Sequence, residues 1–156
     1  DTTQLHSSEA LAYQKLKSWD YFNGIESEGA SYYEAWLRAL LPMIWDEMAK
    51  EKPALEWPTT YMTFRFIREK PDFSFFDIQE TPEKETAREV IRKSFSEGVA
   101  VIEKWKEEKK KEPTWADYKD GYVQHLLRQE AFSYHIKLET KWPKLENGSE
   151  SGKTRH

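Results

Sequence analysis

One stretch of the sequence, residues 27–48, constrains the fold more than any other. Apolar side chains, most of them large, recur there at spacings of three and four, the period at which residues of an α-helix return to one face. They are Tyr32, Tyr33, Trp36, Leu37, Leu40, Leu41, Ile44, Trp45 and Met48. A face this broad has to be buried, so we predict a helix that begins near Ser27 and lies at the centre of the core.

Pro42 lies inside this predicted helix. A proline has no backbone N–H to donate to the carbonyl four residues earlier, and its ring clashes with that carbonyl. We therefore expect the helix to kink at Pro42 or to end early.

A second helix is predicted near the N-terminus. Ser7 or Ser8 can cap it, because a serine hydroxyl accepts a hydrogen bond from the free N–H groups of a first turn. Apolar residues then follow at helical spacing, at Leu11, Ala12, Leu16 and Trp19. The turn-forming pair Asn23-Gly24 closes the segment.

A long helix is predicted in the second half of the chain. The run Thr81-Pro82-Glu83 combines a cap, a proline and an acid, which is typical of a helix start. One apolar stripe follows, made of Ala87, Val90, Ile91, Phe95, Val99, Ile102 and Trp105. Lys109, Lys110 and Lys111 suit the negative end of the helix dipole, and Pro113 follows them.

Other segments allow more than one structure. Residues 61–67 (YMTFRFI) fit a short helix or a strand, and residues 71–76 (PDFSFF) indicate an irregular aromatic segment. Thr114 can cap a helix over residues 115–127. Gly121 disfavours that helix, and residues 122–127 fit an extended segment as well.

These patterns together predict the fold class and the domain organisation. We expect a mainly α protein, an irregular helical bundle with one long central helix, an aromatic-rich core and little or no β-structure. The single helical domain is expected to cover residues 1–143. Residues 144–156 are polar and contain Gly and Ser, which is typical of a flexible tail.

Composition excludes several classes of protein. Lys and Arg number 24 against 28 Asp and Glu, a net charge of −4, so no basic excess attracts nucleic acid. The absence of Cys excludes disulfides and thiol catalysis. No apolar run approaches the roughly 20 residues of a membrane-spanning helix. We therefore predict neither nucleic acid nor a membrane as a partner.

Two short motifs suggest ligand sites but fit them poorly. Residues 148–154 (GSESGKT) resemble a phosphate-binding loop, yet three residues separate the glycines where the motif has four, and no strand precedes them. His125, Glu130 and His135 are metal-ligand types, but their spacing of five does not place them on one helix face. We predict no cofactor and no metal.

No catalytic residue is predicted either. The GxSxG motif of serine hydrolases is absent, and an N-terminal nucleophile must be Ser, Thr or Cys, whereas the first residue is Asp1. Thr2 would qualify only after trimming. Carboxylates are expected to cap helices or to face solvent, since spacing alone does not show a catalytic pair. The carboxylates considered are Asp20, Asp46, Glu47, Asp72, Asp77, Glu83 and Glu85.

Aromatic side chains form the remaining candidate site. Trp and Tyr clusters can line a small-molecule pocket, although at helical spacing they more often form the core. The residues of this candidate aromatic pocket are Trp19, Tyr33, Trp36, Trp45, Trp105 and Trp115.

Four segments occur in an order that is informative about the family. They are residues 1–11 (DTTQLHSSEAL), 18–41 (SWDYFNGIESEGASYYEAWLRALL), 73–95 (FSFFDIQETPEKETAREVIRKSF) and 115–127 (WADYKDGYVQHLL). A Trp-Asp-aromatic motif, a Thr-Pro-Glu pattern before a long helix and a Trp-x-x-aromatic stretch before His-Leu resemble the penicillin acylase family of N-terminal-nucleophile amidohydrolases. The resemblance covers roughly residues 1–135.

The resemblance implies that this chain corresponds to the helical region of the family's large chain, which packs on a sheet. The family cleaves amide bonds, such as the side-chain amide of β-lactam antibiotics, with an N-terminal serine. That serine, the oxyanion donors and the calcium ligands lie outside the matched region. The resemblance also suggests an extracytoplasmic location.

Two departures from the family shape the functional expectation. The chain is shorter than usual between Leu11 and Trp19, and after about Ile136 the sequence KLETKWPKLENGSESGKTRH replaces a glycine-rich, strand-forming continuation. We expect a non-catalytic helical domain, an excised, engineered or divergent piece. The alternatives are one chain of a processed amide hydrolase whose catalytic chain is absent, and a small-molecule-binding helical scaffold. A missing chain, or a second copy on an apolar helix face, is the expected protein partner.

Overall fold

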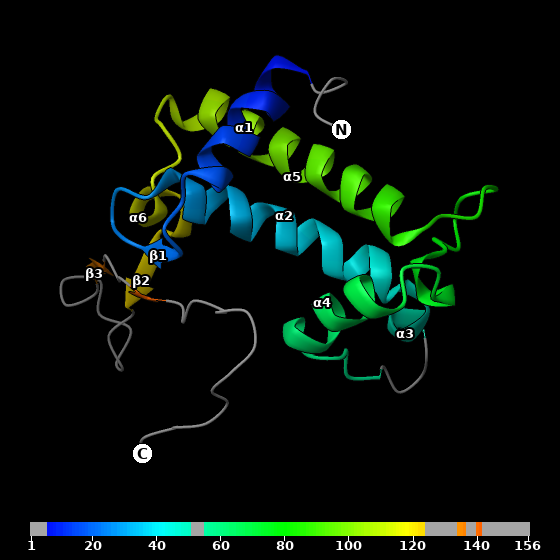
Figure 1. Ribbon diagram of the computed structural model, residues 1–156. Helices are drawn as coiled ribbons and strands as arrows, with labels where there is room; N and C mark the ends of the chain where they lie inside the picture. Colours follow the sequence, from blue (N-terminus) through cyan, green and yellow to red (C-terminus); the bar gives the residue numbers. More distant parts are fainter. Residues whose placement is uncertain (1–5, 51–54, 124–133, 137–139, 142–156) are drawn as a thin grey trace.

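Helix α2 (Glu28–Ile44) lies at the centre of the computed structural model, which describes residues 6–50, 55–123, 134–136 and 140–141 (Figure 1). The side chain of Ser27 caps α2 by accepting a hydrogen bond from the N–H of Ala30 at 3.3 Å. The start predicted near Ser27 is therefore confirmed.

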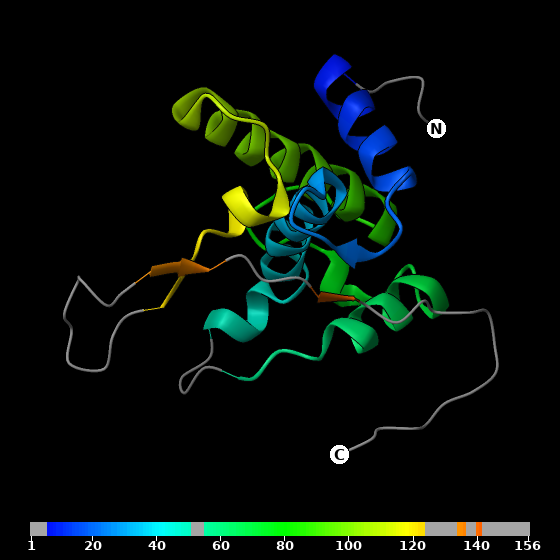
Figure 2. The same cartoon turned by 90° about the vertical axis from the view of Figure 1, so that its left-hand side faces the viewer.

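The other helices pack around α2. Helix α5 (Ala87–Lys109) runs along it, and α1 (Ser7–Lys17) contacts both. Helix α6 (Trp115–Lys119) lies beside the N-terminal half of α2 (Figure 2). Helix α3 (Asp46–Lys50) and the 3₁₀ turn η2 (Ser74–Phe76) contact α2 as well, and α4 (Thr60–Glu69) completes the helices of the described part.

Strands make a small contribution to the fold. Strand β1 (Phe22–Asn23) pairs antiparallel with β4 (Thr140–Lys141), and β2 (Gly121–Val123) pairs antiparallel with β3 (Tyr134–Ile136). The fold is mainly helical, as predicted. In the ranges that the structure describes, no helix combines the length and apolar character needed to cross a membrane.

The contact between α2 and α5 is unusually close at Gly98. A methyl group built on Gly98 would lie 2.7 Å from Cα and 2.8 Å from the backbone N of Trp36. Because the obstacle is backbone rather than a movable side chain, only glycine lets the two helices approach this closely.

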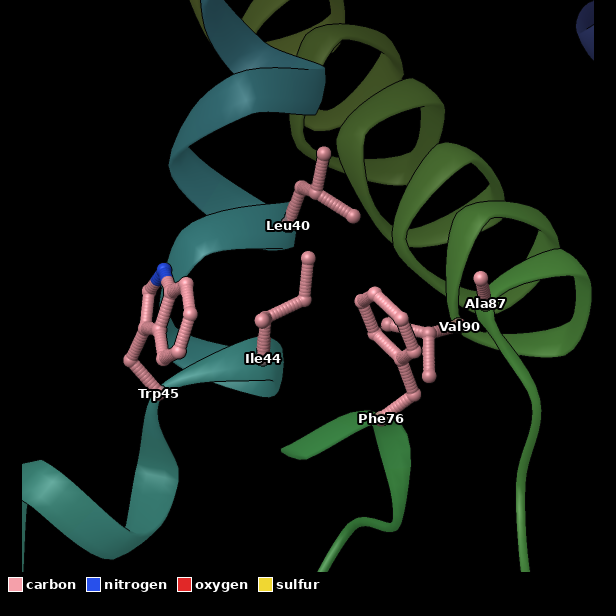
Figure 3. Close-up of a cluster of buried hydrophobic side chains, with 6 residues drawn as sticks. All are labelled: Leu40, Ile44, Trp45, Phe76, Ala87 and Val90. Atoms are coloured by element: carbon pink, nitrogen blue, oxygen red, sulfur yellow. The ribbon is translucent and has the colours of Figure 1, made fainter. Parts of the chain in front are cut away.

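Among the residues that the structure describes, two hydrophobic clusters form the core on either side of this crossing. The first contains Leu40, Ile44, Trp45, Phe76, Ala87 and Val90, with the Phe76 ring beside Val90 (Figure 3). The second contains Ala12, Tyr32, Ala35, Val99 and Ile102. Aromatic rings surround the first cluster, and Phe73 packs 5.1 Å from both Phe66 and Phe75. The predicted aromatic-rich core is present.

Pro42 is accommodated by the end of α2. The helix stops at Ile44, two residues beyond the proline, and the chain restarts as α3 at Asp46. The expectation that the helix would end early is confirmed, and Met48 belongs to α3.

The start predicted for the long helix at Thr81 is wrong. Helix α5 begins at Ala87, where Thr86 and Glu89 form a reciprocal capping box. Thr81 does not cap a helix, because its hydroxyl donates to the Glu85 carboxylate at 2.8 Å.

The cap of α1 differs from the prediction, and the structure of residues 61–67 is now decided. His6, not Ser7 or Ser8, is the N-cap of α1, because Glu9 reaches back to accept a hydrogen bond from the His6 N–H at 2.9 Å. Residues 61–67 belong to helix α4, whose cap Thr59 accepts a hydrogen bond from the N–H of Met62.

Helix α6 is shorter than the pattern over residues 115–127 allowed. Thr114 caps it as predicted, accepting a hydrogen bond from the Asp117 N–H at 3.4 Å. Asp120 then takes a left-handed conformation (φ 42°) that ends the helix, and residues 121–123 are extended. Residues 124–127 and the predicted tail lie outside the described residues.

Candidate functional site

A cavity of about 130 Å³ lies between α2, α6, β1 and the first residue of α4. We call it the α2–α6 cavity. It is lined by Asn23, Ala30, Tyr33, Glu34, Leu37, Thr60 and Trp115.

The helical period of α2 places four of these residues on one face. Ala30, Tyr33, Glu34 and Leu37 follow one another at spacings of three, one and three. Helix α6 closes the cavity because the N–H of Ala116 donates to the carbonyl of Ile25 at 3.1 Å. That bond ties α6 to the loop between β1 and α2.

A charged bridge links α6 to α2 beside the cavity. The Lys119 ammonium donates to Glu34 Oε1 at 2.7 Å and lies 5.2 Å from the centroid of the Trp115 ring. Arg38 donates to the same Glu34 oxygen at 2.9 Å. The carboxylate therefore has two cationic partners, one on each helix.

The charges around the cavity set the protonation states of Glu34 and Tyr33. Burial is the largest influence and raises the pKa of Glu34, but Lys119 and Arg38 together outweigh it and leave that pKa below its usual range. Burial, and then the charge of Glu34, raises the pKa of Tyr33. At neutral pH the carboxylate is ionised and the phenol is protonated.

Asn23, one of the lining residues, carries an unsatisfied acceptor. The residue is 4% exposed, and its buried Oδ1 accepts no hydrogen bond from the residues that the structure describes. Buried polar atoms in folded proteins usually have a partner, so this oxygen is unusual.

The residues of the predicted aromatic pocket do not form one site. Tyr33 and Trp115 line the α2–α6 cavity. Trp19 lies 5.2 Å and Trp36 lies 6.0 Å from Tyr33 between ring centroids, so these three rings form a row. A role for this row in ligand binding stays a prediction.

The two remaining residues of that prediction lie elsewhere. Trp45 packs against Phe75 at 5.3 Å in the first core cluster, and Trp105 packs against Tyr118 at 5.8 Å. Helical spacing could not separate these rings from those near the cavity, because all of them recur on apolar faces.

Five of the seven lining residues were absent from the predicted aromatic pocket, namely Asn23, Ala30, Glu34, Leu37 and Thr60. Asn23 was interpreted as part of a turn, and neither Glu34 nor Thr60 belongs to an apolar pattern. Glu34 follows Ala30 by four residues, so the sequence could have placed both on one face of the helix. No local pattern connects α2 to Asn23 or Thr60.

The indole N–H groups of Trp19, Trp36 and Trp45 are bonded within the described part of the chain. Trp19 donates to the carbonyl of Phe22 at 2.8 Å, Trp36 to Ser94 Oγ at 3.1 Å, and Trp45 to Thr63 Oγ1 at 3.1 Å. The last two bonds connect α2 to α5 and the C-terminal end of α2 to α4. Trp36 and Trp45 therefore help to hold the helices together.

A group of three carboxylates lies near α3. Burial raises the pKa of Glu47, and Asp46 and Asp77 raise it further. Asp46 Oδ2 also accepts a hydrogen bond from the N–H of Gln79 at 3.0 Å. Across the described ranges, no three or more His, Cys, Asp or Glu side chains are arranged to hold a metal ion.

Two sequence motifs cannot be placed. The phosphate-loop-like residues 148–154 lie outside the described residues, as do His125, Glu130 and the side chain of His135. Of the other carboxylates, Asp20 accepts a hydrogen bond from the Phe22 N–H at 3.0 Å, and Asp72 and Glu83 are exposed.

Glu85 is a buried carboxylate with a structural role. It accepts hydrogen bonds from the N–H of Ile78 at 3.1 Å, from the Thr81 hydroxyl and from the Lys93 ammonium. Burial alone raises the pKa of Glu85, but the bonds from Lys93, Thr81 and Ile78 together lower it below its usual range.

We expect Glu85→Gln to lower the free energy of unfolding by about 2 kcal/mol at pH 7, because charge-assisted bonds are lost. The ionised form stabilises the fold fully above the unfolded pKa of about 4.3, and this contribution is lost as the pH falls through the lower folded pKa. The difference between wild type and variant should therefore narrow below about pH 4.

Urea unfolding at pH 3 to 7 measures this difference. Glu83→Gln, an exposed change two residues away, is the matched control and should have almost no effect at any pH. A difference for Glu85→Gln that stays constant down to pH 3 would contradict the prediction.

Comparison with known proteins identifies a family. The family described as penicillin amidase matches the chain over residues 2–151. No curated protein and no solved structure matches it.

Proposed function

The chain belongs to the penicillin amidase family, and we propose that it acts as a non-catalytic helical domain of the kind that supports the catalytic centre in that family. The resemblance to the family's helical region implies that the nucleophilic serine and the oxyanion donors lie outside this part of the fold. On this proposal the chain contributes packing and positioning, and the cleavage of the amide bond belongs to other residues.

The structural use of two tryptophans from the segment that resembles the family supports this proposal. Trp36 belongs to the segment that resembles the family, and its indole N–H donates to Ser94 on the facing helix. Trp19 belongs to the same segment and packs on Tyr33. Large aromatic side chains with satisfied N–H groups contribute mainly to stability.

An activity assay on the purified chain tests the proposal. We expect no turnover of a chromogenic phenylacetyl amide above a buffer blank. Turnover that copurifies with the intact mass of this chain would overturn the non-catalytic assignment.

The same sample tests which partner the chain has. Light scattering after size exclusion should give a monomer mass if the domain stands alone. Copurification of a second polypeptide would instead support the processed amide hydrolase, and a dimer mass would support self-association through an apolar helix face.

The α2–α6 cavity favours a second candidate function, that of a small-molecule-binding scaffold. It combines aromatic walls with a few polar groups, which is the usual composition of a ligand pocket. A thermal-shift screen with small aromatic compounds tests this function, because a ligand that binds only the folded state raises Tm.

A further inference from the structure

We propose that Glu47 and Asp46 share one proton, and that the loss of this proton weakens the contact between α3 and residues 77–80. This inference goes beyond the non-catalytic role in the amidase family and does not depend on the α2–α6 cavity. Its basis is a pair of buried oxygen atoms that one proton can satisfy.

Each of the two carboxyl groups has one oxygen atom without a partner. Asp46 Oδ2 accepts a hydrogen bond from the N–H of Gln79 at 3.0 Å, whereas Asp46 Oδ1 is buried and accepts none from the described residues. The Glu47 carboxyl accepts a hydrogen bond from its own backbone N–H, but Glu47 Oε2 is likewise buried without a partner in the described ranges. Buried polar atoms usually have a partner, so two such oxygens on adjacent residues call for a common explanation.

A proton on one of the carboxyl groups supplies that explanation. The side chains of Glu47 and Asp46 lie within hydrogen-bonding reach of each other. Two ionised carboxylates cannot bond in this way, because both only accept hydrogen bonds. A protonated Glu47 instead donates its O–H to the Asp46 carboxylate, and a hydrogen bond between a neutral and an ionised carboxyl is a strong one.

The charged groups on α3 and on residues 77–80 do not take the place of this proton. Asp77 adds a third negative charge near Glu47. Lys50, the cation at the end of α3, donates to Gln79 Oε1 at 2.9 Å and lies 3.8 Å from Glu80 Oε1. Its ammonium therefore contacts residues 79 and 80 rather than the carboxyl pair.

The two long helices supply no ion pair to these carboxyl groups either. Arg38 of α2 and Glu97 of α5 line a surface hollow together with Asp46. Arg38 donates to Glu34 at 2.9 Å, and Glu97 is exposed. Among the described residues, Asp46 and Glu47 form no ion pair with Lys or Arg. Two acids that share a site without a cation favour a proton between them.

The shared proton makes the junction sensitive to pH. Burial raises the pKa of Glu47, and the hydrogen bond and charge of Asp46 and the charge of Asp77 raise it further, against the opposing bond from the Glu47 N–H. A carboxyl whose pKa is raised by folding stabilises the fold fully below its unfolded pKa of about 4.3, and this contribution is lost as the pH rises through the folded pKa. Above that range three like charges surround the Gln79 bond that ties α3 to residues 77–80, so this contact weakens.

A pH titration of the ¹³C,¹⁵N-labelled chain tests this inference by NMR. We expect the side-chain carboxyl carbon of Glu47 to titrate above the ordinary glutamate value of about 4.3. The Gln79 N–H, which donates to Asp46, should shift with the same midpoint. The Met62 N–H donates to the neutral hydroxyl of Thr59 and should not follow that midpoint. Asp46→Asn removes the adjacent charge and should lower the midpoint of Glu47.

A stability measurement on Glu47→Gln gives a second readout. The amide can donate an N–H to Asp46 at every pH and carries no charge. We expect the unfolding constant of this variant to be more than about twofold below that of the wild type at pH 8, beyond the effect of an ordinary surface substitution. This ratio should move toward one as the pH falls to 4. Glu56→Gln, the same change at an exposed position, is the matched control and should give the same ratio at both pH values.

Three outcomes overturn the inference. They are a Glu47 carboxyl that titrates at or below the ordinary value, a Gln79 N–H that does not respond to that titration, and a stability ratio for Glu47→Gln that is equal at pH 4 and pH 8. If either variant fails to fold, the titration of the wild type decides by itself. None of these outcomes bears on amide turnover, which is measured separately.

Discussion

Replacing Gly98 by alanine should destabilise the protein by about 2–3 kcal/mol, which is the upper part of the typical range for overpacking a well-packed core. The added methyl would lie 2.7 Å from Trp36 Cα and 3.1 Å from the carbonyl carbon of Ala35. Both obstacles are backbone atoms of α2, so no side-chain rotation relieves the clash and α5 has to move away.

Whether Gly98→Ala lowers or raises the stability shows whether helix packing or helix propensity dominates. Alanine is favoured over glycine inside a helix by about 1 kcal/mol, so an isolated helix would become more stable. Glu97→Ala, at the exposed neighbouring position of α5, is the matched control and should change stability by less than about 0.5 kcal/mol.

Urea unfolding followed by circular dichroism measures both variants. A Gly98→Ala protein as stable as the wild type would mean that α2 and α5 are farther apart than described here. In that case the contact at Gly98 would not fix the relative position of the two core clusters.

Replacing Phe76 by alanine should cost about 3–5 kcal/mol, the usual range for truncating a buried aromatic residue. Phe76 is 0% exposed and packs in the first core cluster, where η2 meets α2 and α5 (Figure 3). Its removal leaves a cavity that the surrounding helices can fill only partly.

Tyr61→Ala provides the comparison for this truncation. Tyr61 is 63% exposed, so the loss of an equally large ring should cost less than about 1 kcal/mol. Thermal unfolding should show a clear drop in Tm for Phe76→Ala and little change for Tyr61→Ala. Equal effects of the two changes would show that η2 does not pack on α2.

Much of the helical framework could be predicted from local patterns. The start of α2 at Ser27 and the end of α5 near Lys109 follow from caps, period and terminal charges, all of which act within a few residues. The start of α5 was predicted wrongly because that prediction also used only local patterns. Thr81-Pro82-Glu83 is a good local helix start, but burial of Glu85 draws the Thr81 hydroxyl into another hydrogen bond.

The candidate site could not be predicted in the same way. Its residues lie on four elements, and Asn23 is separated from Trp115 by most of the described chain. Of the predicted aromatic residues, only the tertiary structure distinguishes Tyr33 at the cavity from Trp45 in the core.

The broad apolar face over residues 27–48 determined by itself that this protein has a central helix, because a helix repeats every 3.6 residues and its apolar stripe must be buried. Only the tertiary structure decided what that helix packs against. Gly98 is merely a weak helix former in the sequence, yet it sets the distance between α2 and α5. The α2–α6 cavity exists because residues distant in sequence pack without filling the space between them, and no local pattern encodes that space.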